Sequence, residues 1–552
     1  MRGDIEGAES GSQATSKGVH GMEKTTGSSG TEKKWLVGFL CAFALLVGVA
    51  AAVRFVGLST FPMQLHNDES AMVIHGYKPI LENPKGISLY GSSFSGHPNF
   101  GYLLAAVPTM ITGEYSRLMV RISSAVMGLI SLVMFALFVN RAWGRAASLT
   151  FLAFAATYHF HVHYSRTGFH YIHATFFMGI VSYLFARAVQ SASLVWAGVL
   201  GIAMGFGALV YPATQVLPFA MVAAVLLGVM PAPSMSPSVW RHPLRTLGII
   251  GMFLMGLAIS FGPQALYSYS QGTFNSRLQH TFILHAHNVK HLAPQMGEIP
   301  VNDVGVVYFN LLRTLRFFYA SDTGEQYNFV ENPLPLWGTA LMVVGLMVLV
   351  WRSLKRDVFA LYILVAALLT LTASTLMIEA NFSPHLVLFT LIIPVMCSLG
   401  LQTLLKAVRV KGVALTTLVT VCVMVAWSHW NWRYYNKMMD PYRSRLNDTE
   451  NWLFNLPIGS SQVKQLVNLS KREFHFDESY YQLTFPAARG TKVPGDQGTA
   501  PVDAFLAKNQ CPCILMVDMA QGPSWEDHLT KAGRRVSRFD YTRQPVSFLH
   551  VE

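Results

Sequence analysis

The sequence has few charged residues for its length. Only 13% of its 552 residues are Asp, Glu, Lys or Arg, whereas 52% are hydrophobic, and the mean hydropathy is +0.36. This balance is expected when much of a protein's surface faces lipid rather than water. The composition therefore predicts a polytopic membrane protein.

Cysteines are also scarce, which argues against a disulfide framework. Three of the five, Cys41, Cys397 and Cys422, lie inside apolar segments. Cys511 and Cys513 form a Cys-Pro-Cys sequence that would make a strained ring if it were bridged. We therefore expect these two as small apolar side chains of an ordinary strand, without a redox or catalytic role.

The chain lacks the motifs that bind free nucleotides. It has no P-loop, no dinucleotide-binding glycine sequence, no heptad run and no internal repeat, so any energy must arrive in the substrate itself. The net charge of +12 does not indicate nucleic acid, because the basic residues occur in small groups between apolar runs rather than in one basic domain. We assign this charge to membrane orientation and to phosphate contacts.

Apolar runs of a length that can cross a membrane are abundant. Runs of about 17–25 residues predict about eleven transmembrane helices. The candidate spans are 35–56, 119–139, 146–163, 172–192, 194–210, 214–230, 246–268, 334–351, 358–378, 385–405 and 413–430.

The basic residues of the short connections predict the orientation. Lys and Arg at 33–34, 141–145, 187, 241–245, 352–356 and 406–411 all fall on one side, which should be cytoplasmic. The opposite side has connections poor in Lys and Arg and three long segments, 57–118, 269–333 and 431–552. We expect residues 1–34 to be a disordered cytoplasmic tail, 35–430 to be the transmembrane domain, and 431–552 to be a small soluble α/β domain outside the cytoplasm.

An acidic pair follows the first apolar run, in "QLHNDESAMVIHGY" (64–77), where Asp68 and Glu69 are adjacent. Carboxylates at such a place often cap an interfacial helix. Four other segments on the same side place His, Arg or Tyr where a span meets water, so these residues can line a site shared by water and lipid. They are "SGHPNFGYLL" (95–104), "EYSRLMVRISSAVMGL" (114–129), "HYSRTGFHYIH" (163–173) and "LVYPATQVLP" (209–218).

The order of these motifs resembles that of the C-type glycosyltransferases, the membrane enzymes similar to protein O-mannosyltransferases and lipid A aminoarabinose transferases. The likeness runs over residues 35–230 and more weakly to about 430, where "NFSPHLVLFTLIIP" (381–394) resembles a late family segment. The resemblance implies a C-type fold, a sugar donor carried on a polyprenyl phosphate, and transfer with inversion outside the cytoplasm to a glycan, lipid or protein. The membrane would be the cytoplasmic, or inner, membrane of a cell envelope.

The resemblance also implies roles for particular residues. Asp68 matches the family's first acidic position and is the expected general base, with Glu69 supporting it. Three arginines are expected to bind the donor phosphate, and four residues to line the sugar or acceptor site. The arginines are Arg121, Arg166 and, more weakly, Arg117; the other four are His97, His170, Tyr211 and His385. Each of these residues could instead anchor its helix at the lipid headgroups.

One departure from the family pattern concerns the segment after Ser165 and Arg166. Many members have a second acidic residue there, but this chain has His170, Tyr171 and His173. A mechanism with two carboxylates is therefore unsupported, and His170 is the alternative hydrogen-bond partner.

A metal cofactor is not expected. The outer segment "LQHTFILHAHNVKH" holds His280, His285, His287 and His291, but no Cys, Asp or Glu completes a zinc site near them. A divalent metal at Asp68 is also disfavoured, because no Asp-x-Asp pattern is present.

Other classes of function remain open from the sequence. A transporter or flippase of a lipid-linked substrate would place charges near the bilayer midplane in two matched halves. A catalytically silent envelope scaffold would keep the fold without turnover. A polysaccharide polymerase or ligase would depend on arginines of the 269–333 segment, such as Arg277 and Arg313.

Overall fold

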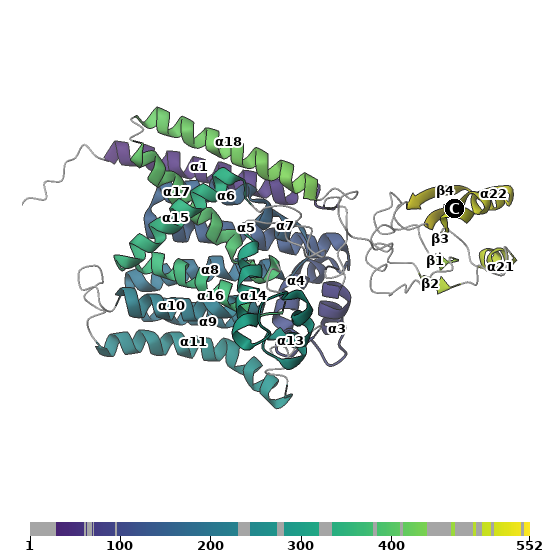
Figure 1. The fold of residues 1–552 in the computed structure, drawn as a ribbon, viewed down its shortest axis with the longest axis horizontal. Coiled ribbons are helices and arrows are strands. Elements are labelled where there is room, and N and C mark those ends of the chain that lie inside the picture. The colour runs from purple at the N-terminus through teal and green to yellow at the C-terminus, as the bar shows by residue number, and fades with distance from the viewer. Residues whose placement is uncertain are drawn as a thin grey trace, which may run out of the picture.

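The protein forms a large helical body and a smaller α/β unit, as a computed structural model shows (Figure 1). The structure describes residues 29–59, 62, 69, 71–93, 96–229, 243–272, 281–318, 334–378, 383–408, 412–438, 465–469, 489–492, 500–508, 513–541 and 546–552.

Within these described ranges, seven helices are long and apolar enough to cross a membrane. They lie in α1 (Ser29–Phe55), α5 (Arg117–Trp143), α8 (Tyr171–Ser191), α11 (Pro243–Ser270), α15 (Leu336–Leu354), α16 (Val358–Thr375) and α17 (Phe389–Ala407). Each coincides with a span expected from the sequence. α1 already begins at Ser29, before the apolar run at 35, so the expected boundary of the N-terminal tail at 34 was placed too late.

The other expected spans take different forms. The runs at 194–210 and 214–230 become shorter apolar helices, α9 (Leu194–Ala208) and a stretch made of η3 (Pro212–Val216), α10 (Leu217–Ala224) and η4 (Val225–Val229). The last run lies in α18, which continues from Val413 to Met438. The expected domain boundary at 430–431 therefore falls inside a helix.

The expected span 146–163 is interrupted. α6 (Arg145–Thr157) is followed by Tyr158, whose ψ of 112° is extended. α7 (His159–Arg166) begins immediately after this residue. An interruption leaves backbone carbonyls without helical partners, which is tolerated at membrane depth only when protein groups bind them. Here the guanidinium of Arg54 in α1 donates to the carbonyl oxygen of Ala156 at 2.9 Å. The indole N–H of Trp427 in α18 donates to the carbonyl oxygen of Phe154 at 2.9 Å.

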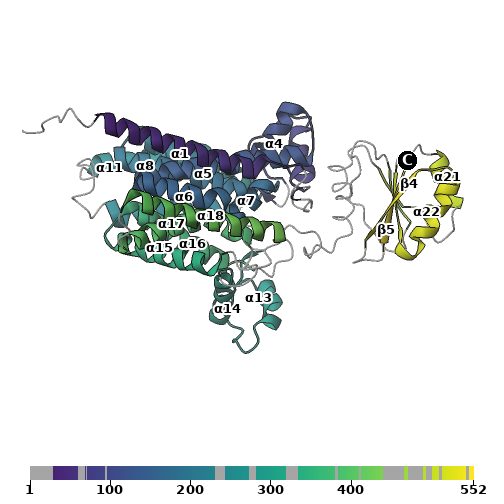
Figure 2. The same ribbon diagram turned by 90° about the horizontal axis from the view of Figure 1, so that it is seen from above.

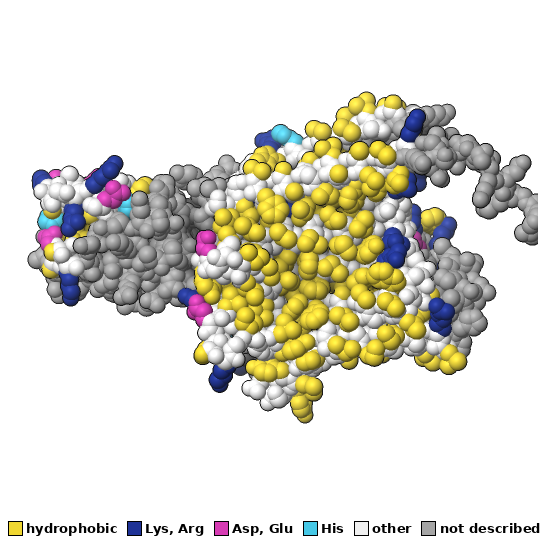
Figure 3. Space-filling model, turned by 180° about the vertical axis from the view of Figure 1, so that it is seen from behind, with side chains coloured by type: hydrophobic (Ala, Val, Ile, Leu, Met, Phe, Trp, Pro, Cys, Tyr) yellow, Lys and Arg dark blue, Asp and Glu magenta, His cyan; other side chains and the backbone are white. Residues whose placement is uncertain are grey.

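Close packing of the helices depends on glycine where two backbones meet. A Cβ atom at Gly345 of α15 would collide with the carbonyl of Met396 in α17, and one at Gly400 of α17 would collide with the carbonyl of Leu341 in α15. Small residues allow this close approach, which is typical of helix pairs in membranes. One face of the helical body is covered by hydrophobic side chains, with Lys and Arg toward its margins (Figure 3).

One end of the helical body gathers basic residues of the short connections. Arg141 at the end of α5 donates to Gln190 at the end of α8 (2.9 Å), and Trp143 donates to Asp357 at the start of α16 (3.1 Å). Asp357 also accepts from Arg352 at the end of α15 (3.3 Å). These bonds bring the ends of α5, α8, α15 and the start of α16 together, and we call this the basic end.

The opposite end carries shorter elements of the long segments. They are η1 (Met72–Tyr77), α3 (Lys78–Leu81), α4 (Asn99–Thr112), α13 (Ala286–Leu292), η6 (Ala293–Gln295), α14 (Asp303–Arg316) and η7 (Ser383–Leu386). α13 and α14 project from the side of the helical body (Figure 2). We call this the outer end.

In the C-terminal α/β unit, β3 (Cys513–Asp518) is the strand expected at Cys513. Its sheet has the order β2-β1-β3-β5-β4, in which β1 (Gln465–Asn468) pairs in parallel with β2 (Arg489–Lys492) and β3. β5 (Val546–Val551) pairs antiparallel with β3 and with β4 (Val536–Tyr541). Three helical segments complete the unit: α21 (Ala500–Lys508), η9 (Met519–Gln521) and α22 (Gly522–Lys531).

The interpretation of the Cys-Pro-Cys sequence was wrong. Cys513 is disulfide-bonded, whereas Cys41, Cys397 and Cys422 are free. Cys511 lies outside the described residues. The strand expected through both cysteines begins only at Cys513, the first residue of β3.

Candidate active site

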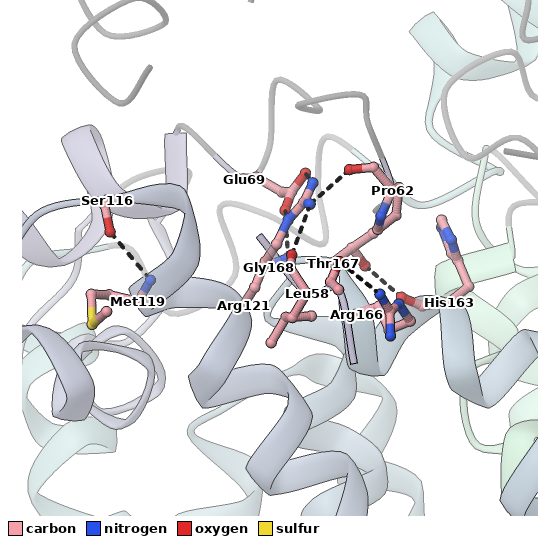
Figure 4. Close-up of polar contacts among 11 residues, drawn as sticks. Leu58, Pro62, Glu69, Ser116, Met119, Arg121, His163, Arg166, Thr167 and Gly168 are labelled. Carbon is pink, nitrogen blue, oxygen red and sulfur yellow. Dashed lines mark hydrogen bonds and ion pairs between the residues drawn. The ribbon is translucent and has the colours of Figure 1, made fainter. Parts of the chain in front are cut away.

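Glu69 and Arg121 form a buried ion pair at the outer end. Arg121 donates from Nε to Glu69 Oε1 at 2.8 Å and from Nη2 to Oε2 at 3.0 Å, and both side chains are fully buried. The N–H of Gly168, between α7 and α8, donates to the same carboxylate at 2.8 Å. Arg121 also donates to the carbonyl oxygen of Pro62 at 2.7 Å (Figure 4).

This pair joins three segments that are distant in the sequence. It connects the segment that follows α1, the first turns of α5 and the connection between α7 and α8. A bidentate contact between a guanidinium and a carboxylate is strong and geometrically specific. Glu69 therefore positions the segment that contains the acidic pair. Two N–H groups of Arg121 donate to the Glu69 carboxylate. Asp68, the expected base, lies outside the described residues.

Arg166 binds the end of the first helix. Its Nη1 donates to the carbonyl oxygen of Val53 at 2.6 Å, and its Nη2 donates to those of Val56 at 2.9 Å and Gly57 at 3.1 Å. These carbonyls belong to the last turn of α1 and the residues after it, where a helix leaves its acceptors unpaired. Burial lowers the pKa of the Arg166 guanidinium; Tyr435 opposes this change, and the charge of Arg121 adds to it.

A third arginine, Arg54, was missed by the sequence analysis. It is fully buried and donates to the carbonyl oxygens of Ala50 and Ala156 at 2.9 Å each. Its Nη2 also lies 2.9 Å from His161 Nδ1, and His161 Nε2 lies 2.9 Å from Ser131 Oγ. A lone arginine in the last turn of an apolar run was the signal available, because charges within spans are costly and rare.

Three of the four residues expected at the sugar or acceptor site lie together. The ring of His170 is 4.8 Å from that of His97 and 5.2 Å from that of Tyr211, between centroids. Tyr171 joins them at 5.1 Å from Tyr211, and we call these four residues the ring cluster. The fourth expected residue, His385, lies in η7 before α17.

Each ring is presented where an element begins. His97 and Pro98 precede α4, in a loop that Gly96 turns with a φ of +71°. His170 is the residue before α8, and Tyr211 is the residue before η3. The three connections meet at the outer end because α8 and α9 pack side by side and α4 begins next to them.

A cavity of about 190 Å³ has both apolar and polar residues in its walls, His159 and Asn431 among the polar ones. Its walls include Val53 of α1, Val162 of α7 and Tyr435 of α18. Val53 provides a carbonyl to Arg166, and Tyr435 interacts with Arg166 electrostatically. The cavity could therefore take an apolar chain whose polar end lies near that arginine.

The remaining candidates occupy other positions. Arg117 is the first residue of α5, and its side chain lies outside the described atoms. Arg313 donates to Asn310 Oδ1 at 3.2 Å and to the carbonyl oxygen of Ile378 at 3.4 Å, whereas Arg277 and His280 lie outside the described residues. His285 precedes α13, and the described part of the chain holds no group of three residues arranged for a metal ion.

The chain also resembles known proteins. Residues 96–258 match the family model of dolichyl-phosphate-mannose-protein mannosyltransferase. The structure is similar to that of ArnT from Cupriavidus metallidurans bound to undecaprenyl phosphate, with 14% identity, a TM-score of 0.51, and coverage of 92% of this chain and 97% of ArnT. The chain has the fold of the C-type membrane glycosyltransferases.

The archaeal oligosaccharyltransferase AglB from Archaeoglobus fulgidus, in complex with an inhibitory peptide and a dolichol-phosphate, is a weaker match. It has 11% identity, a TM-score of 0.49, and coverage of 94% of this chain and 74% of AglB. No curated protein matches the chain by sequence. Within the C-type fold, the family segment 96–258 contains His97, Arg121, Arg166, His170 and Tyr211.

Proposed function

We propose that this multi-pass membrane protein is a glycosyltransferase that moves a sugar from a polyprenyl-phosphate carrier to a hydroxyl group of a glycan, lipid or protein. The C-type fold and the mannosyltransferase family segment support this class of reaction. Within the class, Asp68 is the general base and the sugar is transferred with inversion.

The observation that carries the proposal is the attachment of the acidic segment to the ring cluster. Glu69 accepts the N–H of Gly168 at 2.8 Å, and His170 of the ring cluster follows Gly168 by two residues. Asp68 is the neighbour of Glu69 in the chain. The Glu69 carboxylate is therefore bonded to the backbone two residues before His170, whose ring can stack on a sugar and donate hydrogen bonds to it.

The chemistry follows from these groups. The acceptor oxygen attacks the anomeric carbon while Asp68 takes the hydroxyl proton, since a neutral hydroxyl is a poor nucleophile. The bond between the anomeric carbon and the phosphate oxygen breaks, and its electron pair leaves on the lipid phosphate. That phosphate needs cationic donors, and Arg166, which binds the carbonyl of the cavity residue Val53, is the best placed of the described arginines.

The role proposed for Arg121 differs from the phosphate contact expected from the sequence, whereas Glu69 keeps its expected supporting role. In this proposal Glu69 and Arg121 are positioning residues, because both are fully buried and bound to each other.

The proposed location is the cytoplasmic membrane, with the N-terminus in the cytoplasm and the α/β unit outside it. The basic end supports this orientation, because Lys and Arg of short connections favour the cytoplasmic side. The disulfide of Cys513 supports it from the other direction, since disulfides persist in oxidising compartments.

Turnover by Asp68→Asn tests the proposal. The full chain is purified in detergent, and the release of polyprenyl phosphate is followed with a panel of polyprenyl-phosphate sugars and a cell-envelope extract. Asn keeps the shape of Asp but cannot accept the proton, so we expect turnover to fall by about 10²–10⁴-fold while the binding of undecaprenyl phosphate is retained.

The matched control is Asp303→Asn, which removes an exposed carboxylate from the first turn of α14. It should keep the turnover of the wild-type protein. If wild type releases no polyprenyl phosphate from any donor, the glycosyltransferase assignment fails. If Asp68→Asn turns over like Asp303→Asn, the assignment of the base fails.

A further inference from the structure

Unlike an ordinary surface helix, α14 exposes a long apolar stripe. The side chains of Asn310 and Thr314 are fully buried, whereas Val304 is 79% exposed and Tyr308 52% exposed. Helices of water-soluble surfaces bury their apolar stripe and expose their polar one. α14 therefore buries Asn310 and Thr314 beside the apolar Val306, and it directs a long apolar stripe outward.

The two buried polar residues are held by the end of a candidate membrane span. Asn310 Nδ2 donates to the carbonyl oxygens of Thr375 (3.1 Å) and Met377 (2.7 Å), and Thr375 Oγ1 donates to Thr314 Oγ1 (3.2 Å). Thr375 is the last residue of α16, which is apolar enough to cross a membrane. α14 is thus fixed at the level where α16 leaves the hydrocarbon.

The apolar stripe is continuous over the whole helix. Its residues are spaced by three and four positions, so they share one face. They are Val304, Tyr308, Leu311, Leu312 and Leu315, and each is at least 39% exposed. An exposed apolar stripe of this length marks a surface that contacts a protein or a membrane.

The surroundings favour lipid as the contact. α13 and α14 project from the side of the helical body at the outer end (Figure 2). Arg316 in the last turn is exposed, and amphipathic helices with basic residues beside an apolar face lie in the headgroup region of membranes.

We propose that α14 is an interfacial helix that lies on the outer leaflet of the membrane. Its apolar stripe inserts at the boundary between headgroups and acyl chains, and Arg316 contacts lipid phosphate. The proposal goes beyond the glycosyl transfer reaction and does not depend on it.

Spin labels measure the depth of this stripe directly. Val304→Cys, Tyr308→Cys and Leu315→Cys are made one at a time in the full chain, with the exposed Cys41 and Cys422 changed to Ser. Each labelled protein is placed in nanodiscs of phosphatidylcholine and phosphatidylglycerol. Collision rates are then measured with oxygen, which concentrates in the bilayer, and with a water-soluble nickel chelate.

Two controls calibrate the result. Leu254→Cys on α11, 52% exposed within a candidate span, reports lipid, and Lys290→Cys, exposed on α13 in the same projecting lobe, reports water. We expect the three stripe labels to resemble Leu254 more than Lys290, at a depth of about 5–10 Å. Labels that behave like Lys290, or that collide with neither reagent because protein covers them, would overturn the proposal.

Discussion

The two ends of the helical body use arginine in different ways. At the basic end, Arg141 pairs with an exposed glutamine, and Arg187 lies 4.7 Å from the ring of Trp196. At the outer end, Arg54, Arg121 and Arg166 are buried and bind carbonyl oxygens or a buried carboxylate. Burying a charge is costly, whereas exposed pairs contribute little. The buried arginines, with their desolvation cost, therefore lie at the end where we place an anionic substrate.

The largest difference between the two ends should be the loss of stability caused by Arg121→Gln compared with that caused by Arg352→Gln. Removing one partner of a buried pair leaves the Glu69 carboxylate uncompensated, so the free energy of unfolding should fall by about 3–5 kcal/mol. Arg352 pairs with Asp357 at 3.3 Å with a third of its side chain exposed, so its loss should cost about 0.2–1 kcal/mol. Thermal unfolding of the two full-length variants in one detergent measures the difference, and equal losses would erase the contrast.

A smaller contrast should separate Asn431→Leu from Gln190→Leu. Asn431 Oδ1 accepts the N–H of His159 at 2.9 Å and lies 2.7 Å from its Nδ1, where α7 begins. A buried donor left without its acceptor costs about 1–3 kcal/mol, whereas changes of exposed residues such as Gln190 stay within about 0.5 kcal/mol. Denaturant unfolding monitored by tryptophan fluorescence compares them. An Asn431→Leu variant as stable as Gln190→Leu would show that the helix interruption does not depend on this amide.

The smallest contrast concerns the rings. His170→Ala should weaken donor or acceptor binding, because a stacked ring pair contributes about 0.5–1.5 kcal/mol, and KM should rise by up to about tenfold. Arg187→Ala removes a ring contact at the basic end and should leave KM unchanged. Steady-state turnover of both variants gives the two values. A lower melting temperature of His170→Ala with an unaltered KM would mean that the ring cluster serves packing alone.

The apolar runs were sufficient to predict most of the helical body, because a membrane span requires a run of fixed length. The interruption at Tyr158 was not predicted, since the run from 146 to 163 is continuous and the break depends on partners such as Arg54, Trp427 and Asn431 far along the chain. In the same way, α14 is recognisable as amphipathic from its spacing. Which stripe faces the protein depends on the carbonyls that end α16, and no local pattern contains that information.

The candidate site was predictable in part. His97, His170 and Tyr211 were proposed from motifs at the ends of spans, and their rings lie in contact. The pairing of Glu69 with Arg121 was not predicted, because a sequence does not tell whether an arginine at a membrane boundary faces a ligand, a lipid or another side chain. The role of Asp68 stays a prediction until turnover is measured.

The binding partners of Arg54 also bear on how the protein is made. Arg54 is synthesised 102 residues before Ala156, whose carbonyl oxygen it binds in the folded protein. At a synthesis rate of about 5–20 residues per second, Ala156 is added about 5–20 s after Arg54. During this interval the guanidinium can extend to the headgroups from the last turn of α1. α1 therefore enters the membrane before this partner exists, and it can complete its packing only after α6 has been made.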